Sequence, residues 1–372
     1  MKYRVLLVGG GTAGHVEPAL SVGKWLREQN NSPAAIECEF LGTSSGLERE
    51  LVPNAGFKLH TITKAPLPRK LNATALFWPV KLLLSVFQSL LLIKRFDLII
   101  GFGGYVSAPA YIAGWILRVP IVIHEANAKP GWANNLGARF SKKNTVAFAS
   151  AQSTGGNWRD ADVVGMPMRA EIRAVALMPQ GEVALLKSKI CTQLNLDAQA
   201  PIVFAFGGSL GSRAMNTAIT GSINEFTKLG LNLIHVVGKA NLLPKATKGY
   251  APLAYVSNMA ELYAISDLVI ARSGAVTCAE LMATGKFALL VPLPIGNGEQ
   301  VANAATLVQS EQAEICENTK FNSDWLGSNI SRLLTVAKSR STKGMTITNQ
   351  LDAQAQLGVL ARLQKDRFLA SH

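Results

Sequence analysis

The fold is decided by the stretch Tyr3-Arg4-Val5-Leu6-Leu7-Val8-Gly9-Gly10-Gly11-Thr12-Ala13-Gly14-His15, an apolar run that ends in a glycine-rich loop. Much further along the chain, Ile202-Val203-Phe204-Ala205-Phe206 leads in the same way into Gly207-Gly208-Ser209-Leu210-Gly211-Ser212. Each stretch predicts a buried strand, a tight loop and the start of a helix. This arrangement points backbone N–H groups and the positive end of a helix dipole at one place, which suits an anion. The two loops therefore predict two similar α/β domains and two phosphate-bearing substrates.

Length and composition limit the class of protein. The chain has 372 residues, of which 48% are hydrophobic, enough for two domains with buried sheets. Its formal net charge of +13 indicates an anionic partner, such as nucleic acid, a phosphorylated substrate or an acidic membrane, without choosing among them. The four cysteines form no CxxC or Cys/His cluster, so we expect free thiols in a reducing cytosol. The first apolar run stops at glycines after Val8, which indicates a strand and not a signal peptide.

Short apolar runs alternate with amphipathic segments along most of the chain. In the first half they predict strands at 3–8, 35–41, 57–62, 97–101, 120–124 and 144–148, with helices near 16–29, 46–54, 79–95, 107–117 and 131–140. In the second half they predict strands at 202–206, 232–238, 253–256, 267–271 and 287–293. Such alternation is typical of doubly wound parallel sheets joined by right-handed crossovers.

The domain organisation follows from where this alternation is interrupted. The polar stretch 151–168, marked by glycine and proline, is interpreted as a linker. We expect an N-terminal Rossmann-like domain at 1–165 and a C-terminal Rossmann-like domain at 166–351. A helix at about 352–372 is expected to join the first domain.

Residues 76–93 come close to the run of about 18 apolar residues that a membrane span needs. Pro79, Lys81 and Ser85 interrupt the run, and a predicted strand follows almost at once, so we expect no span. As a helix, the segment has a polar stripe at 81, 85 and 88 and an apolar arc too wide for one core contact. Some of its apolar side chains should therefore be exposed.

The surroundings of this segment favour a membrane surface. No acidic residue occurs between Val52 and Phe96. An apolar helix ringed by cations is typical of the lipid interface, where each Lys or Arg contributes about 1 kcal/mol. The alternative is a buried core helix with solvated basic ends. The predicted membrane patch consists of Leu76, Phe77, Trp78, Val80, Leu84 and Phe87, with Arg69, Lys70 and Lys81.

The first glycine loop allows two interpretations. Gly9-x-Gly11-x-x-Gly14 fits the dinucleotide-binding fingerprint, and Glu37 or Glu39 could loosely supply the acidic residue that such a site needs. A dinucleotide oxidoreductase is therefore one hypothesis. It leaves the second glycine loop, at 207–211, without a function.

His15 directly follows the first loop and is the leading candidate for a general base. The helix dipole there disfavours the imidazolium form, so the ring should stay neutral, as a base requires. A histidine that only caps the loop or binds phosphate is the alternative. Among the other histidines only His124, beside Glu125 at the end of a predicted strand, is a rival.

Two later segments predict binding groups for a sugar nucleotide. Ser273, Gly274, Ala275 and Thr277 form a helix N-terminus suited to a diphosphate, and Glu280 could accept two ribose hydroxyls. A dipole-stabilising acid is the alternative role for Glu280. Gln300 and Asn303 lie on one side of a further helix, where amides suit sugar hydroxyls.

We expect the reaction to need no metal ion or other cofactor. The string Asp160-Ala-Asp162 lies in the predicted linker and is interpreted as a solvated turn. Helix dipoles and backbone N–H groups are expected to stabilise the leaving diphosphate instead.

Six motifs in order resemble one family over essentially the whole chain. They are Gly9–His15, Gly101-Phe-Gly-Gly-Tyr-Val-Ser107, His124-Glu-Ala-Asn127, Gly207–Gly211, Arg272-Ser-Gly-Ala-Val-Thr277 with Glu280, and Gly298-Glu-Gln300 with Asn303. Together they are similar to the MurG family of bacterial N-acetylglucosaminyltransferases. The resemblance implies a GT-B fold, two Rossmann-like domains facing across a cleft. It also implies peripheral attachment to the cytoplasmic side of the bacterial cell membrane.

The same resemblance implies the reaction and its partners. N-acetylglucosamine would pass with inversion from UDP-GlcNAc to the 4-hydroxyl of undecaprenyl-linked muramyl pentapeptide (lipid I), forming lipid II for peptidoglycan. The partners would be these substrates, the anionic inner leaflet and, as candidates, other cell-wall synthesis proteins, but no nucleic acid. A lipid-carrier binding protein of the same fold, without catalysis, remains an alternative.

The family's functional residues carry over to matching positions here. Glu280 would bind the ribose, and Gln300 and Asn303 the GlcNAc hydroxyls. The other implied donor contacts are Tyr255, Arg169 and the backbone of Val256 at the uracil, Ser209, Ser273, Gly274, Ala275 and Thr277 at the diphosphate, and Thr12, Ala13, Gly14 and Asn127 at the sugar. The acceptor diphosphate would meet Gly10, Gly11, Gly103, Gly104 and Tyr105, with His15 as the base.

Three residues depart from the family's pattern. Ala13 stands where the family often has glycine, a small change that should not close the loop. Leu210 stands where glutamine is common, which removes an amide near the donor phosphates. Glu299 replaces a frequent glutamine and puts a negative charge beside the sugar site.

Overall fold

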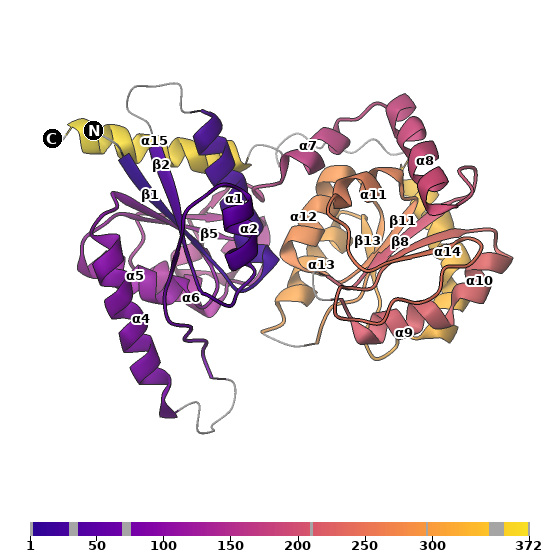
Figure 1. The fold of residues 1–372 in the computed structure, drawn as a ribbon, viewed down its shortest axis with the longest axis horizontal. Coiled ribbons are helices and arrows are strands. Elements are labelled where there is room, and N and C mark those ends of the chain that lie inside the picture. Colours follow the sequence, from indigo (N-terminus) through magenta and orange to yellow (C-terminus); the bar gives the residue numbers. More distant parts are fainter. Residues whose placement is uncertain are drawn as a thin grey trace. The chain divides into compact units, whose positions relative to one another are not determined.

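The computed structural model describes residues 3–29, 36–68, 76–208, 211–294, 297–341 and 353–370. By its internal contacts the chain divides into two compact units (Figure 1). The first unit comprises Met1–Arg169 and Asn349–His372, and the second comprises Ala170–Thr348. Each unit is built on a parallel sheet of its own.

Within the described residues, the sheet of the first unit has seven parallel strands in the order β3-β2-β1-β4-β5-β6-β7. The strands are β1 (Tyr3–Gly9), β2 (Ile36–Gly42), β3 (Leu59–Thr61), β4 (Leu98–Gly103), β5 (Ile121–Glu125), β6 (Lys143–Val146) and β7 (Asp162–Val163). On β1, Val5 and Leu7 pack into the core on one face of the sheet, and Leu6 and Val8 into the core on the other. Because both faces are covered, the strand is a continuous apolar run in the sequence.

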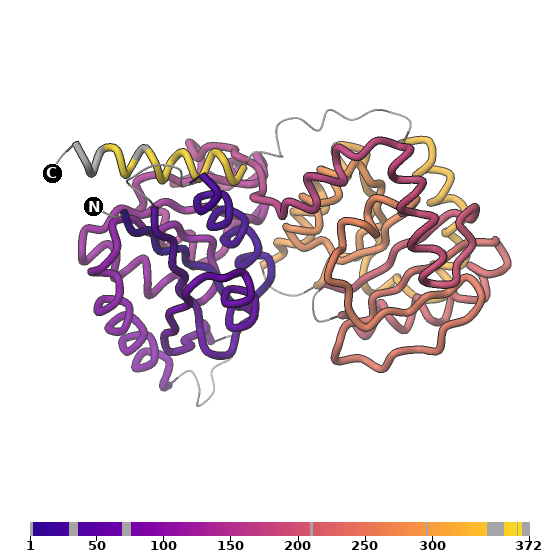
Figure 2. Tube along the Cα trace, turned by 45° about the horizontal axis from the view of Figure 1, so that its top comes forward, coloured from indigo at the N-terminus to yellow at the C-terminus, as the bar shows by residue number. Residues whose placement is uncertain are grey.

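The described helices of the first unit include one from the C-terminal part of the chain. They are α1 (Ala13–Glu28), α2 (Glu48–Asn54), α4 (Trp78–Ile93), α5 (Ser107–Ile116), α6 (Trp132–Gly137) and α15 (Ala353–Ala370), with the 3-10 helices η1 (Ala149–Thr154) and η2 (Gly156–Trp158). Figure 2 shows α15, in yellow, against the N-terminal part of the unit. A Cβ on Gly358 would lie 2.1 Å from the Trp25 ring of α1, so glycine permits this close packing. The Arg362 guanidinium lies over the same ring, 5.2 Å from its centroid.

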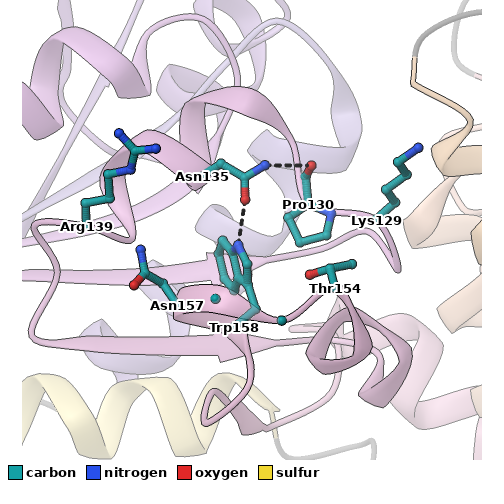
Figure 3. Close-up of a pocket in the computed structure, with 9 residues that line it drawn as sticks. Lys129, Pro130, Asn135, Arg139, Thr154, Asn157 and Trp158 are labelled. Atoms are coloured by element: carbon teal, nitrogen blue, oxygen red, sulfur yellow. Dashed lines mark hydrogen bonds between the residues drawn. The ribbon is translucent and has the colours of Figure 1, made fainter.

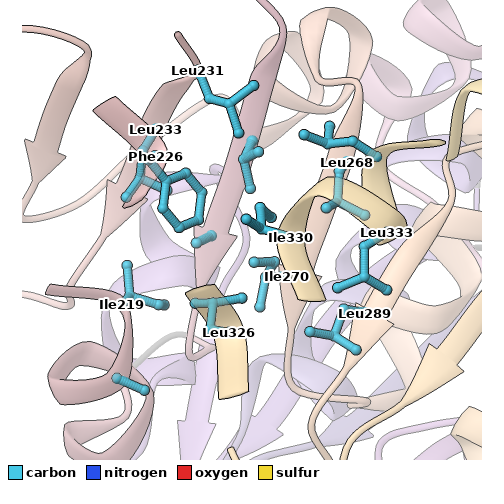
Figure 4. Packing of buried hydrophobic residues seen from close by; sticks show 14 of the residues in the cluster. Ile219, Phe226, Leu231, Leu233, Leu268, Ile270, Leu289, Leu326, Ile330 and Leu333 are labelled. Atoms are coloured by element: carbon cyan, nitrogen blue, oxygen red, sulfur yellow. The ribbon is translucent and has the colours of Figure 1, made fainter. Parts of the chain in front are cut away.

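The second unit has, within the described residues, six parallel strands in the order β10-β9-β8-β11-β12-β13. They are β8 (Ile202–Phe206), β9 (Asn232–Val236), β10 (Tyr250–Leu253), β11 (Leu268–Ala271), β12 (Ala288–Leu290) and β13 (Ala313–Ile315). The helices are α7 (Ala170–Ala176), α8 (Gln180–Leu194), α9 (Arg213–Gly221), α10 (Ile223–Lys228), α11 (Met259–Ile265), α12 (Ala275–Thr284), α13 (Glu299–Gln309) and α14 (Ser323–Ser341). Leu326, Ile330 and Leu333 of α14 pack in one cluster with Ile270 and Leu289 of the sheet (Figure 4).

Helix α4 turns its small polar residues inward and its large apolar residues outward. Ser85 and Ser89 are fully buried, and the Ser89 hydroxyl donates to the carbonyl oxygen of Ser85 at 2.8 Å. Leu83 and Phe87 are 69% and 57% exposed. The polar stripe predicted at 81, 85 and 88 is therefore not one solvated face, because the small serines allow close packing against the unit. None of the helices within the described residues combines the length and hydropathy needed to cross a bilayer.

The stretch 151–168, predicted to be a linker, is packed into the first unit. It contains most of η1, all of η2 and β7, which pairs with β6. Trp158, Ala161 and Val164 are buried in the core. The linker interpretation was wrong because glycine and proline mark tight turns between short elements as readily as they mark an open connection.

Candidate active site

The loop between β1 and α1 meets the loop after β4 backbone to backbone. Gly11 has φ +91° and Gly104 has φ +88°, a conformation that residues with a Cβ rarely adopt. A Cβ on Gly104 would lie 2.2 Å from the carbonyl oxygen of Gly10, so only glycine allows this approach. The structure thereby brings together the residues expected to receive the acceptor diphosphate, namely Gly10, Gly11, Gly103, Gly104 and Tyr105.

One amide of this loop has an internal acceptor. The N–H of Gly11 donates to Oε2 of Glu48, the first residue of α2, at 3.0 Å. That N–H is therefore directed at a carboxylate in this structure, and the role of Gly11 at the acceptor diphosphate stays a prediction. No role for Glu48 was predicted from the sequence.

His15 lies half-buried in the first turn of α1, just after the N-cap residue Thr12. Its Nδ1 lies 3.2 Å from the carbonyl oxygen of Gly10 and 3.1 Å from Oγ1 of Thr12. Because a carbonyl oxygen can only accept, Nδ1 carries a proton, and in the neutral ring Nε2 holds the lone pair. A Cβ on Gly103 would lie 3.3 Å from Nε2, so the basic nitrogen faces the glycine loop after β4. This orientation suits a general base.

A buried carboxylate orders the loop that carries Asn127. The backbone N–H and side-chain amide of Asn127 both donate to Oε1 of Glu125, at 2.8 and 3.0 Å. The Gly131 N–H and the Asn134 amide donate to Oε2, at 3.0 and 2.9 Å. Asn134 in turn accepts from the Tyr111 hydroxyl at 2.8 Å. The orienting roles of Glu125 and Asn134 were missed by the sequence analysis, because no local pattern distinguishes them.

His124, the rival base, is enclosed in the core. Its side chain is fully buried, and its Nδ1 lies 3.1 Å from the Thr145 hydroxyl. That hydroxyl donates to the carbonyl oxygen of Ile123, so it accepts from His124. Burial lowers the pKa of His124 to about 3. The ring is therefore neutral and has no solvent-accessible surface through which to reach a substrate.

The second glycine loop begins at the end of β8 and leads into α9. Gly211 has φ +74°, and a Cβ there would lie 2.1 Å from the carbonyl oxygen of Val237. Ser212 caps α9, with its Oγ accepting from the Met215 N–H at 3.5 Å. Ser209, expected at the donor diphosphate, and Leu210 lie outside the described residues, as do Arg69 and Lys70 of the predicted membrane patch.

Arg272, at the end of β11, ties three segments of the second unit together. Its Nη2 donates to Oγ of Ser212 at 2.8 Å. Its Nη1 donates to the carbonyl oxygen of Val291 at 2.9 Å and to Oδ1 of Asn318 at 2.8 Å. The side chain is buried, and burial lowers the pKa of its guanidinium. Arg272 is the first residue of one of the six motifs, but no role was predicted for it from the sequence.

The start of α12 has the form expected of a diphosphate site. Gly274 is its N-cap residue, so Ala275 and Thr277 present first-turn N–H groups without partners inside the helix. Ser273, just before them, is fully buried. Glu280 follows on the same helix, buried to 4% exposure, and its Oε2 accepts from the Tyr263 hydroxyl at 3.1 Å. Its carboxylate is thus held in a fixed orientation.

Gln300 and Asn303 belong to the first turns of α13. Oε1 of Gln300 accepts from the Leu293 N–H at 2.9 Å, which leaves its amide N–H groups as the donors for a ligand. Asn303 is fully buried and donates to the carbonyl oxygen of Ser273 at 3.2 Å. In this structure Asn303 therefore links α13 to the α12 loop, and its role as a sugar ligand stays a prediction.

The predicted uracil contacts come from separate segments. Tyr255 is 52% exposed, and the Lys239 ammonium lies 4.3 Å from its ring centroid. Val256 is half-buried beside it. Arg169, the last residue of the first part of the first unit, is half-buried. The exposed Tyr255 ring is available for stacking, and Lys239 is a neighbour that the sequence analysis missed.

Two domain models of one family match the chain. The N-terminal domain of glycosyltransferase family 28 matches residues 5–146, and the C-terminal domain of the same family matches residues 202–357. The UDP-N-acetylglucosamine–N-acetylmuramyl-(pentapeptide) pyrophosphoryl-undecaprenol N-acetylglucosamine transferase of Corynebacterium diphtheriae is 40% identical over 335 residues, or 89% of this chain and 88% of that protein. The chain belongs to glycosyltransferase family 28.

Further family 28 relatives support the same placement. The protein of the same name from Frankia casuarinae is 35% identical over 373 residues, or 98% of this chain and 96% of its own. The crystal structure of MurG from Acinetobacter baumannii matches with a TM-score of 0.72 and 26% identity, covering 97% of this chain and 99% of that one. The predicted GT-B fold and the resemblance to the MurG family are confirmed. Membership of family 28 also makes the chain a glycosyltransferase, so the oxidoreductase hypothesis is not retained.

A hollow of about 470 Å³ in the first unit lies outside the predicted family 28 site. It is lined by Lys129, Pro130, Asn135, Arg139, Thr154, Gly155, Gly156, Asn157 and Trp158. Figure 3 shows Lys129 and Arg139 on opposite sides of it, with the Trp158 Nε1 donating to Asn135 Oδ1 between them at 2.6 Å. None of the predicted site residues lines this hollow.

Within the described ranges, no three His, Cys, Asp or Glu side chains are grouped so that they could hold a metal ion. Asp160 and Asp162 are both exposed, and Asp162 pairs with Lys143 at 2.8 Å. The four cysteines are free thiols.

Proposed function

We propose that the chain transfers N-acetylglucosamine from UDP-GlcNAc to the 4-hydroxyl of undecaprenyl-diphosphate-linked muramyl pentapeptide, forming lipid II and UDP in peptidoglycan synthesis. The observation that carries this proposal is the 40% identity over 89% of the chain to a transferase whose name states that reaction. The second observation is the position of His15, whose Nε2 faces the glycine loop after β4.

The proposed chemistry is a single inverting displacement. Nε2 of His15 takes the proton of the muramyl 4-hydroxyl as that oxygen attacks the anomeric carbon of the donor sugar. A β-1,4 bond forms from O4 to this carbon, and the bond to the diphosphate oxygen breaks, so that UDP leaves with the electron pair. The N–H groups at the start of α12 stabilise the leaving diphosphate. This step uses protein groups alone, and we propose that it needs no metal ion.

The second unit is proposed to bind the donor. The orientation of Glu280, held by the Tyr263 hydroxyl, suits it to accept the ribose hydroxyls. The amide of Gln300 is held by the Leu293 N–H so that its donors can meet the hydroxyls of the sugar. The exposed Tyr255 ring is proposed to stack on the uracil.

The first unit is proposed to bind the lipid-linked acceptor at the cytoplasmic surface of the bacterial membrane. Leu76, Phe77, Val80, Leu84 and Phe87 of the predicted patch are between 47% and 76% exposed. Trp78 is only half-buried and its Nε1 donates to the carbonyl oxygen of Ala65 at 3.3 Å, so it anchors the helix as well. Trp115 and Ile116 at the end of the neighbouring helix α5 are also exposed, by 57% and 50%.

Replacing apolar side chains on this surface by aspartate tests the membrane proposal. The double variant Leu83→Asp/Phe87→Asp is expected to lower the partition coefficient onto phosphatidylglycerol vesicles at least about 10-fold, because two large apolar side chains leave the interface. The measurement is co-sedimentation with the vesicles. The matched control is Leu177→Asp/Leu185→Asp in the second unit, which replaces side chains that are 71% and 74% exposed. Equal sedimentation of both double variants and the wild type would rule out this face as the membrane contact.

UDP release tests the proposed function itself. The purified chain is incubated with UDP-GlcNAc in the presence and absence of a lipid I analogue, and free UDP is measured. We expect release that depends on the acceptor. Binding of UDP-GlcNAc without any release would instead support a lipid-carrier binding protein, and no binding at all would remove the donor assignment.

A further inference from the structure

A buried carboxylate lies directly under the first glycine loop. Glu48 is fully buried at the start of α2. Its Oε2 accepts from the Gly11 N–H at 3.0 Å. Its Oε1 accepts from both the backbone N–H and the hydroxyl of Thr43, at 2.9 and 3.0 Å. A carboxylate in the interior is costly unless its oxygens are bonded in this way.

Glycine residues around Glu48 leave the space that its side chain occupies. A Cβ on Gly10 would lie 2.8 Å from a Glu48 oxygen, and a Cβ on Gly46 would lie 2.1 Å from one. A Cβ on Gly42 would lie 2.3 Å from the Glu48 Cγ. Gly10 of the first glycine loop and two glycines of the β2–α2 connection therefore enclose the same carboxylate, so its position is closely defined.

The hydrogen bond from the Gly11 N–H to Glu48 sets the orientation of the Gly10 carbonyl, which accepts the proton of His15. The N–H of Gly11 and the carbonyl of Gly10 belong to the same planar peptide group and point in opposite directions. When Glu48 holds the N–H, the carbonyl oxygen of Gly10 is turned towards Nδ1 of His15, 3.2 Å away. That contact keeps the proton on Nδ1 and the lone pair on Nε2.

The bonds to Thr43 control the aromatic ring beside the loop. An ionised carboxylate only accepts, so the Thr43 hydroxyl donates its proton to Glu48. The Tyr105 hydroxyl, 3.2 Å away, must then donate to Thr43 Oγ1. The Tyr105 ring packs against Gly11, where a Cβ would lie 2.7 Å from its Cε1. One carboxylate thus fixes both the ring of Tyr105 and the peptide next to His15.

We propose that Glu48 is a positioning residue for the transfer reaction. Through the Gly10–Gly11 peptide it holds His15 in the tautomer with a basic Nε2, and through Thr43 it holds Tyr105 at the acceptor site. This inference rests on the proposed function for the identity of the substrates. The orientation of the His15 ring is a property of the free protein and can be measured without them.

Glu48→Gln tests the proposal at nearly constant volume. The glutamine side chain has one oxygen and one NH2 group, so an amide N–H must face either the N–H of Gly11 or the N–H of Thr43. The hydrogen bond from Gly11 or those from Thr43 are therefore lost. We expect kcat to fall about 100-fold, the usual scale for a misplaced catalytic group, with the KM for UDP-GlcNAc unchanged. If the bond to Gly11 is the one lost, the ring ¹⁵N resonances of His15 should show loss of the pure Nδ1–H tautomer. If the bonds to Thr43 are lost, the KM for the acceptor should rise instead.

Thr43→Val tests the contact to Tyr105 separately from the contact to Gly11. It also provides a test if Glu48→Gln does not fold. It keeps the Gly11 bond but removes the hydroxyl that holds Tyr105, so we expect a higher acceptor KM with the His15 resonances of the wild type. Thr43→Ser restores the hydroxyl and should lower the acceptor KM again. A folded Glu48→Gln protein with the wild-type kcat, the wild-type His15 resonances and the wild-type acceptor KM would overturn the proposal. So would a Thr43→Val protein that retains the wild-type acceptor KM.

The failure of the proposed function would look different. In that case the wild type itself would release no UDP with a lipid I analogue. The tautomer of His15 in the wild type and in Glu48→Gln would still decide whether Glu48 positions the ring.

Discussion

Replacing His15 by alanine is expected to lower the turnover number at least ~100-fold, while the affinity for UDP-GlcNAc stays near that of the wild type. The variant loses the only group that we place to take the proton of the acceptor hydroxyl. The donor contacts proposed on the second unit are not changed. Steady-state UDP release with a lipid I analogue gives the turnover number, and calorimetric titration gives the donor affinity.

A matched variant separates the base from a structural cap. His15→Gln can keep a donor to the Gly10 carbonyl, as Nδ1 does at 3.2 Å, but it cannot take up a proton. We expect it to be as inactive as His15→Ala. Recovery of turnover with glutamine would show that the ring only caps the loop, and wild-type turnover in His15→Ala would assign the base to another group.

Replacing Arg272 by methionine is expected to destabilise the second unit by about 3 kcal/mol or more, because each buried acceptor that loses its donor costs about 1–3 kcal/mol. The methionine fills the space of the arginine stem but leaves the Val291 carbonyl, the Asn318 amide oxygen and the Ser212 hydroxyl without this partner. Urea-induced unfolding followed by circular dichroism measures the change. Because Ser212 ends the second glycine loop, we also expect weaker binding of UDP.

Arg332 provides the control within the same unit. It makes two hydrogen bonds to the Glu314 carboxylate, both at 2.9 Å, but its side chain is 49% exposed. Arg332→Met should therefore cost less than about 1 kcal/mol. Equal losses of stability in the two variants would mean that Arg272 acts as an ordinary surface charge.

The sheets were predictable from the sequence because buried parallel strands are short, continuous apolar runs. The run at 202–206 coincides with β8, and all six strands predicted in the first half overlap the observed strands by three residues or more. The errors lie at the sheet edges. Strand β10 ends at Leu253, where a strand was expected to begin, and β7 and β13 were not predicted. Edge strands are short and half-covered, so their apolar pattern is weak.

The candidate site was predictable only where local sequence determines it. The glycine loops could be found because positive φ angles and close backbone approach require glycine at fixed spacing. Glu48, Glu125 and Arg272 could not, because a charged residue in a sequence is ordinarily on the surface. Their burial depends on partners that the fold brings from distant segments, such as Gly11 and Thr43 for Glu48. The same holds for Ser85 on α4, whose inward direction is set by packing and not by its own polarity.

The close approach of Gly104 to the carbonyl of Gly10 has a thermodynamic consequence. Because the two backbones lie so close that a Cβ on Gly104 would be 2.2 Å from the Gly10 carbonyl oxygen, we expect the two loops to move together. Any preference of the lipid-linked substrate for one arrangement of the loop after β4 is then also a preference for one arrangement of the loop that holds His15. Such coupling is reciprocal. If binding of the acceptor raises the population of the catalytic His15 orientation by some factor, then fixing His15 in that orientation raises the affinity for the acceptor by the same factor.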